Sequence, residues 1–213
     1  MSGGRIDLSR GIEGHNLGVG LAAEDFSIKG TTLWICEQWS EEQCEWVRQR
    51  MDKFYDGKYD AVKRKVGISS STLRELGLAP DLGVKEIAGN LLLNEGIQEA
   101  WKLITAAGGT NAYNAANAQI GVGDSSAAEA ATQTDLQAST NKLYKGMNAT
   151  YPSLAAQTES FQSDFLTAEA NYAWNEWSIR NGATGDKNLN RKVASLGTKA
   201  TGTWTLTAQV TLA

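Results

Sequence analysis

Residues 171–180, NYAWNEWSIR, and residues 203–212, TWTLTAQVTL, decide the fold class of this 213-residue chain. In the second stretch, apolar and polar residues alternate strictly over ten positions. This is the pattern of a β-strand with one face on a core and the other in water. The first stretch carries large groups on both faces, with Tyr172 and Trp174 on one and Trp177 on the other. Such a strand is either central in a sandwich or lies beneath a partner subunit.

Further alternating runs precede and separate these two stretches. Clusters of Gly, Pro, Asn and Asp divide them, at intervals of roughly 10–20 residues. Short strands at this spacing are typical of an antiparallel sandwich or barrel. The six predicted strands are residues 118–123, 142–151, 157–166, 170–180, 188–195 and 203–212. The fold class is therefore predicted to be mainly β, an antiparallel β-sandwich of six or more strands with a helical N-terminal part.

Helical patterns lie outside the strand-rich part. The sequence SEEQ at 40–43 is typical of a capping box, in which the serine oxygen accepts from the amide of Gln43 and the glutamine side chain returns to the serine amide. A second helix, at about 95–106, carries an apolar stripe at helical spacing, and we expect it to pack across the sheet. In one strand, 118–123, the glycine face is expected to let a ring or another backbone approach closely.

The composition changes near residue 85. The first 90 residues carry 12 basic and 14 acidic side chains, whereas residues 91–213 carry 8 and 10 over a longer span. A breaker, PDLG at 80–83, lies close to this change. Two regions are therefore predicted. Residues 1–85 form an anchoring region, with a glycine-rich extended arm over residues 1–30 and short helices, and residues 86–213 form the sandwich domain.

Residues capable of catalysis or metal binding form no recognisable constellation. His15 is the only histidine, and Cys36 and Cys44 are the only cysteines. An enzyme would need a nucleophile with a base, paired carboxylates or a metal site. We therefore expect no enzymatic activity, no cofactor, and no catalytic or metal-binding residue. The two thiols are expected to be reduced and buried, as fits assembly in a cytoplasm.

Charge and hydropathy also limit the partners. The net charge of −4 argues against a nucleic-acid surface, and the only basic run, KRK at 63–65, is short enough to be a solvated turn. No apolar run approaches the roughly 18–20 residues of a membrane span. We therefore expect no contact with nucleic acid or a membrane.

Several short motifs resemble a pattern found in tailed-phage virions. These are IGVGD at 120–124, NYAWNEWSI at 171–179, a glycine-bearing loop at 182–185 and LNRKV at 189–193. Together they resemble the N-terminal domains of phage tail-collar and tail-fibre proteins, and GNLLLNEGI at 89–97 resembles uncharacterised phage structural proteins. The resemblance covers roughly residues 89–213. No fibre or receptor-binding region follows residue 213, so the resemblance implies an adaptor without a fibre.

The resemblance implies a bacteriophage virion structural protein that is assembled in the host cytoplasm and functions in the virion. Its expected role is a tail, baseplate or fibre-attachment adaptor. Its expected partners are other virion proteins and further copies in a homo-oligomer. The alternatives are a capsid decoration or head-fibre protein, which the sequence does not separate from a tail protein although the collar-like motif favours the tail. A carbohydrate-binding module, whose exposed aromatic side chains stack on a host-surface glycan, is the third alternative.

Seven tryptophans agree with large apolar contact areas, because aromatic side chains dominate both cores and subunit interfaces. The carbohydrate-binding alternative requires Tyr172 and Trp174 to be exposed. The residues predicted as interface candidates are Trp34, Trp39, Tyr172, Trp174 and Trp177.

Overall fold

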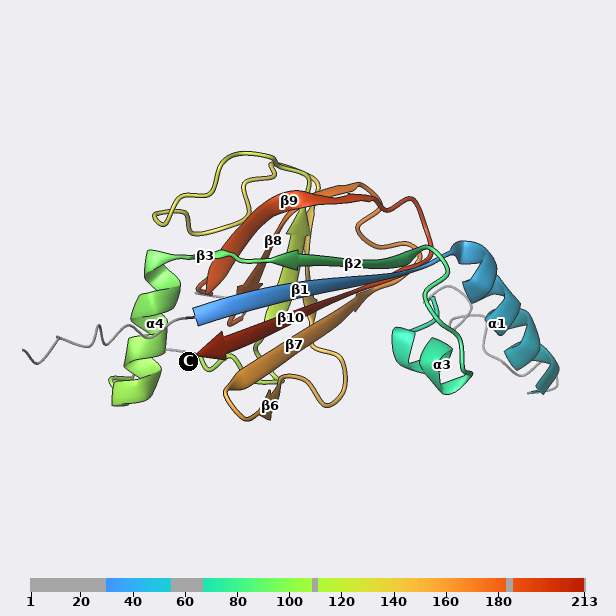
Figure 1. The fold of residues 1–213 in the computed structure, drawn as a ribbon, viewed down its shortest axis with the longest axis horizontal. Helices are drawn as coiled ribbons and strands as arrows, with labels where there is room; N and C mark the ends of the chain where they lie inside the picture. Colours follow the sequence, from blue (N-terminus) through green and yellow to red (C-terminus); the bar gives the residue numbers. More distant parts are fainter. Residues whose placement is uncertain (1–29, 55–66, 109–110, 183–185, 213) are drawn as a thin grey trace, which may run out of the picture.

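The computed structural model describes residues 30–54, 67–108, 111–182 and 186–212. These residues form two five-stranded antiparallel sheets that pack face to face (Figure 1). The strand orders are β2-β1-β10-β7-β6 and β3-β9-β8-β4-β5. The predicted mainly β fold with sandwich architecture is confirmed.

The elements follow one another along the chain as β1 (Gly30–Trp39), α1 (Glu41–Phe54), α3 (Ser70–Glu75), β2 (Gly83–Ala88), β3 (Leu91–Leu92), α4 (Asn94–Thr105), β4 (Gln119–Gly123), β5 (Lys142–Gly146), β6 (Ser153–Ala155), β7 (Thr158–Phe165), β8 (Ala173–Arg180), β9 (Asn190–Thr198) and β10 (Thr203–Leu212).

The N-terminal part contributes two strands to the sandwich. β1 pairs with β10 along its whole length, from Gly30 opposite Leu212 to Trp39 opposite Thr203, and β2 pairs with the other side of β1. The division predicted near residue 85 therefore differs from the observed sheet, because that residue lies inside β2. β1 was not recognised as a strand because two of its four alternating buried positions, Thr32 and Gln38, are polar. Residues 1–29 of the predicted arm over residues 1–30 lie outside the described residues, and Gly30 begins β1.

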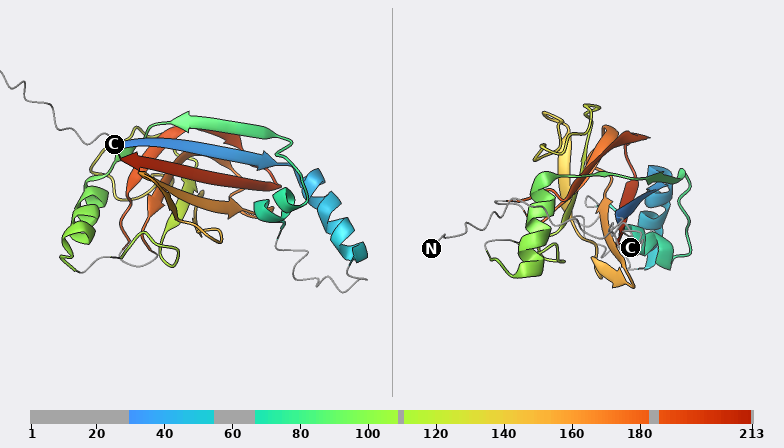
Figure 2. Two further views of the ribbon diagram at one scale, coloured as in Figure 1. Left: turned by 60° about the horizontal axis from the view of Figure 1, so that its bottom comes forward. Right: turned by 60° about the vertical axis from the view of Figure 1, so that its left-hand side comes forward.

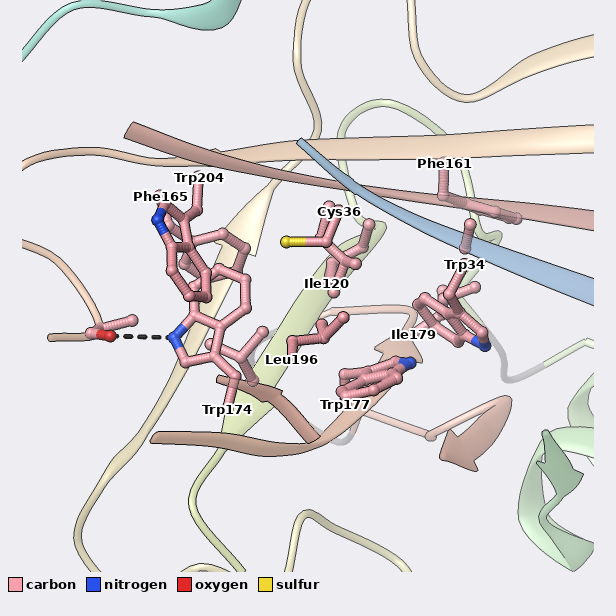
Figure 3. Packing of buried hydrophobic residues seen from close by; sticks show 14 of the residues in the cluster. Trp34, Cys36, Ile120, Phe161, Phe165, Trp174, Trp177, Ile179, Leu196 and Trp204 are labelled. Carbon is pink, nitrogen blue, oxygen red and sulfur yellow. Dashed lines mark hydrogen bonds between the residues drawn. The ribbon is translucent and has the colours of Figure 1, made fainter. Parts of the chain in front are cut away.

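Aromatic side chains dominate the core between the sheets (Figure 3). Trp174 lies between Phe165 and Trp204, with ring centroids 4.8 Å and 5.0 Å away, and both pairs meet edge to face. Trp34 and Trp177 form a third such pair at 6.0 Å. These geometries are the favoured ones for aromatic pairs and add to the free energy gained from burial.

Trp174 and Trp177 both enter this core although they are three residues apart. The register of β8 against β9 shifts between Trp174 and Glu176, so that Trp174 pairs with Gly197 but Glu176 pairs with Val193. The irregularity interrupts the alternation of faces. The strict alternation predicted for this strand was therefore wrong at this point, because it placed the two tryptophans on opposite faces.

The helices α1 and α3 close one end of the sandwich with a small apolar cluster of their own. Cys44 and Val47 from α1 and Leu73 from α3 pack with Trp39, the last residue of β1, and with Ile68. Figures 1 and 2 show this pair of helices at one end of the molecule and α4 at the other.

The predicted capping box at α1 is half present. Ser40 Oγ accepts a hydrogen bond from the amide of Gln43 at 3.1 Å, as expected. The reciprocal bond is not made by the glutamine. Instead, the amide of Ser40 donates to Asp81 at 2.8 Å, and the Gln43 side chain donates to the carbonyl of Ala79. The helix start is therefore tied to the segment that leads into β2.

Candidate interaction surfaces

A fully buried ion pair lies on the outer side of the second sheet. Arg191 of β9 contacts Glu176 of β8 through Nη2 and Nε, both 2.7 Å from Oε2. Neither side chain is exposed to solvent. The carboxylate also accepts backbone hydrogen bonds from Gln137 at 2.9 Å and Ala138 at 2.7 Å. Both carboxylate oxygens are therefore engaged with donors.

The other donors of the arginine continue the same connection. Its Nη2 donates to the carbonyl of Ala127 at 2.9 Å, and its Nη1 donates to the carbonyl of Ala128 at 3.3 Å and to Gln133 Oε1 at 3.0 Å. All these partners belong to the long connection between β4 and β5, residues 124–141, which we call the cover loop. Since a buried charge is costly unless it is paired and hydrogen-bonded, this set of bonds fixes the cover loop on the sheet.

Two glycines of β4 allow side chains to lie flat beneath the cover loop. A Cβ atom at Gly121 would overlap the ring of Tyr144, and one at Gly123 would lie 2.6 Å from Glu176 Oε1. The tyrosine hydroxyl reaches the cover loop and donates to Asp135 Oδ1 at 2.7 Å. The close approach predicted for the glycine face of this strand is confirmed.

The helix α4 does not occupy the position predicted for it. Its first turn is fixed to the end of the second sheet, where Glu95 Oε1 accepts from the amide of Asn188 at 2.8 Å. A Cβ atom at Gly96 would overlap the backbone of Leu189, so only glycine permits this contact. The prediction that the helix packs across the sheet is wrong, because the cover loop takes that place and the helix faces the fold with Gly96 and Glu99.

The apolar stripe of α4 consequently points away from the sandwich. Ile97, Trp101 and Ile104 are spaced by four and three residues, so they share one side of the helix. Their exposed fractions are 40%, 59% and 73%. Leu92, just before the helix N-cap, is 39% exposed. We call these four side chains the α4 face. A contiguous apolar surface of this kind is typical of an interaction site.

The interface candidates predicted from the sequence lie elsewhere. Trp34, Trp39, Trp174 and Trp177 are fully buried within the chain's own cores. Tyr172 is half-buried, and its hydroxyl donates to the carbonyl of Val122 at 3.2 Å. The four tryptophans therefore contribute to the chain's own cores.

The α4 face was missed as an interface although its stripe was recognised. Periodicity shows which residues of a helix share a side, but not whether that side meets the chain's own sheet or a partner. Gly96, inside a helical run, was the available signal, because a glycine there often marks a close contact with backbone.

Burial shifts the pKa values of two thiols and one lysine among the described residues. Burial raises the pKa of the Cys36 thiol to about 12 and also raises that of Cys44, and both thiols are free. Burial lowers the pKa of Lys199 to about 8. Its Nζ donates to the carbonyl of Leu166 at 2.9 Å and to Asn171 Oδ1 at 2.8 Å. No group of three or more potential metal ligands occurs among the described residues, while His15 and the basic run at 63–65 lie outside them.

No protein family, curated protein or solved structure matches this chain. None of the helices in the described ranges is long and apolar enough to span a membrane. The α4 face is thus the candidate site that the geometry itself identifies.

Proposed function

We propose that this chain is a bacteriophage virion structural protein that serves as an adaptor in the tail, at the baseplate or where a fibre attaches. The exposed α4 face carries this proposal. It presents the equivalent of about two fully exposed large apolar side chains at one end of the sandwich. Exposed apolar area of this kind can form the buried core of a protein–protein interface.

The motifs that resemble phage tail-collar proteins support the proposal in a second way. They fall on β4, β8 and β9, which are neighbours in the second sheet. Within them, Gly123 leaves room for the Glu176 carboxylate, and that carboxylate pairs with Arg191. The resemblance therefore concerns one connected structural unit, the part of the sheet that holds the cover loop.

The alternatives identified from the sequence differ in their support. A capsid decoration or head-fibre protein would use the same apolar area, so it remains the second outcome of the test below. A carbohydrate-binding module would need Tyr172 and Trp174 as exposed stacking platforms, and Trp174 is fully buried while the hydroxyl of Tyr172 is bonded to Val122. We therefore propose no glycan-binding function for these two residues.

The position of the protein in a particle tests the proposal directly. An antibody raised against the purified chain would be applied, with a gold label, to particles produced from the genome that encodes it. Label at the tail is the expected result, and label over the capsid would favour the decoration protein. Particles that carry no label and contain none of this chain by mass spectrometry would refute a virion role.

A further inference from the structure

The α4 face contains no charged side chain. The helix carries three charged side chains, and all are in ion pairs within the chain. Glu99 accepts from Lys102 Nζ at 2.6 Å, and Glu95 lies 3.4 Å from Lys187 Nζ. The exposed apolar stripe is therefore bordered by neutral or internally neutralised groups. A partner selected by opposite charge would find no complement here, whereas an identical neutral surface meets no like-charge repulsion.

The area of the α4 face is also close to what a symmetric pair requires. At about 200 Å² for each large apolar side chain, the exposed fractions of its four members amount to about 420 Å² in one copy. Two such faces together would bury about 850 Å² of apolar surface, and the polar rim around them would bring the total to about the lower limit for a specific interface, about 1,000 Å². One copy alone leaves this surface in water.

The placement of the helix permits a second copy to approach. Figures 1 and 2 show α4 at the end of the molecule, outside the ends of the long strands. Only its Gly96 and Glu99 are buried, so the opposite side is open along most of its length. An isologous contact needs a patch that is complementary to itself under a twofold axis. With the two helices antiparallel, Ile97 of each copy would face Ile104 of the other. The two helix dipoles would point in opposite directions.

We infer that the α4 face binds the α4 face of a second copy of this chain, in an antiparallel, twofold helix pair centred near Trp101. This inference deepens the proposed function and rests on it only in treating the α4 face as a protein-binding surface. The neutral stripe, its area and its open position each favour the same occupant.

Light scattering on the purified full chain, from about 1 to 100 µM, tests the inference. The expected mass is twice 22.9 kDa for the native chain and 22.9 kDa for Trp101→Glu, with a dissociation constant raised at least tenfold. Trp46→Glu is the matched control. Trp46 is 44% exposed on α1 at the opposite end, so this variant should remain a dimer. Both replaced side chains are exposed, and circular dichroism should show unchanged folding.

A cysteine substitution tests the symmetry. In Trp101→Cys, the two new thiols would lie near the twofold axis, and mild oxidation should give a covalent dimer. The native Cys36 and Cys44 are buried and should not contribute.

Other outcomes would overturn the inference. A monomeric native chain over the whole range would do so, and protection of Trp101 from a soluble quencher in that monomer would show that the same chain covers the face. A trimer, or a dimer that persists in Trp101→Glu, would exclude the twofold α4 pair. None of these results bears on the particle-labelling experiment, so the inference can fail while the virion role stands.

Discussion

Replacing Arg191 with methionine removes one partner of the buried ion pair and keeps much of the side-chain volume. Glu176 would then be left as a buried charge with only the two amides of the cover loop as donors. Three acceptors in the cover loop would lose their donor at the same time. We expect this single substitution to destabilise the protein because the buried carboxylate of Glu176 would have no opposite charge to pair with.

The magnitude follows from the burial of both groups. Breaking a fully buried pair by removing one partner costs about 3–5 kcal/mol. Since domains are commonly stable by only about 5–15 kcal/mol, this is a large part of the total. With a urea dependence of about 1–3 kcal/mol per molar, the unfolding midpoint should fall by roughly 1–5 M. Tryptophan fluorescence is a suitable measure because Trp174, Trp177 and Trp204 are buried in the core.

Two further variants separate the ion pair from a general effect of losing an arginine. Arg50→Met removes an exposed arginine that lies over the ring of Trp46, and its effect should stay within about 0.5 kcal/mol. Replacing both Glu176 and Arg191 with methionine removes the uncompensated charge, and we expect this double variant to be more stable than Arg191→Met alone. The reasoning would be refuted if Arg191→Met cost no more than Arg50→Met, or if proteases cut the cover loop no faster in Arg191→Met.

Three other predictions follow from single positions. Gly121→Ala should lower stability by about 1–3 kcal/mol in chemical unfolding because its methyl group would overlap the Tyr144 ring, whereas Gly146→Ala, with open space around it, should be nearly neutral. The pKa of Lys199 falls from 10.5 in the unfolded chain to about 8 in the fold, so the unfolded chain binds more protons at this residue between these values. Relative to Lys199→Met, the native chain should therefore gain stability as the pH rises from about 8 to about 10.5, while the raised pKa of Cys36 acts equally in both. The Cys36 thiol, with its pKa raised to about 12, should resist iodoacetamide in the native protein and react once urea unfolds it; labelling of Cys36 at a similar rate in the native state would contradict its burial.

The sequence predicted those strands whose two faces differ clearly in polarity. β10 spans residues 203–212, as predicted, because its apolar residues alternate without interruption. β8 was located correctly, but its side-chain directions were not, since a register shift leaves no mark in composition. β1 was missed because Thr32 and Gln38 occupy inward positions that alternation normally assigns to apolar residues. Gln38 is accommodated there through a bond to the carbonyl of Leu196, a contact 158 residues away that no local pattern reports.

The exposure of the α4 face also depends on contacts between residues that are far apart in the sequence. The stripe of α4 is equally compatible with packing on the sheet and with exposure, so the choice depends on what else covers the sheet. The cover loop is rich in Ala, Ser, Thr and Gln and has no strong periodicity, and nothing local predicts that it lies flat on β4 and β8. Its placement depends on the pairing of Glu176 with Arg191, two residues on different strands. The long-range pairing of Glu176 with Arg191 thus determines that the cover loop, and not α4, packs on the second sheet.

The cover loop and the α4 face are therefore two consequences of one arrangement. The ion pair and the glycines of β4 hold the cover loop against the second sheet, and this excludes α4 from that sheet. The helix then faces the fold only with Gly96 and Glu99, and the stripe that would otherwise have formed core becomes surface. The residues that carry the resemblance to phage collar proteins do not themselves lie on the proposed interface. They hold the cover loop on the sheet, and the α4 stripe stays exposed.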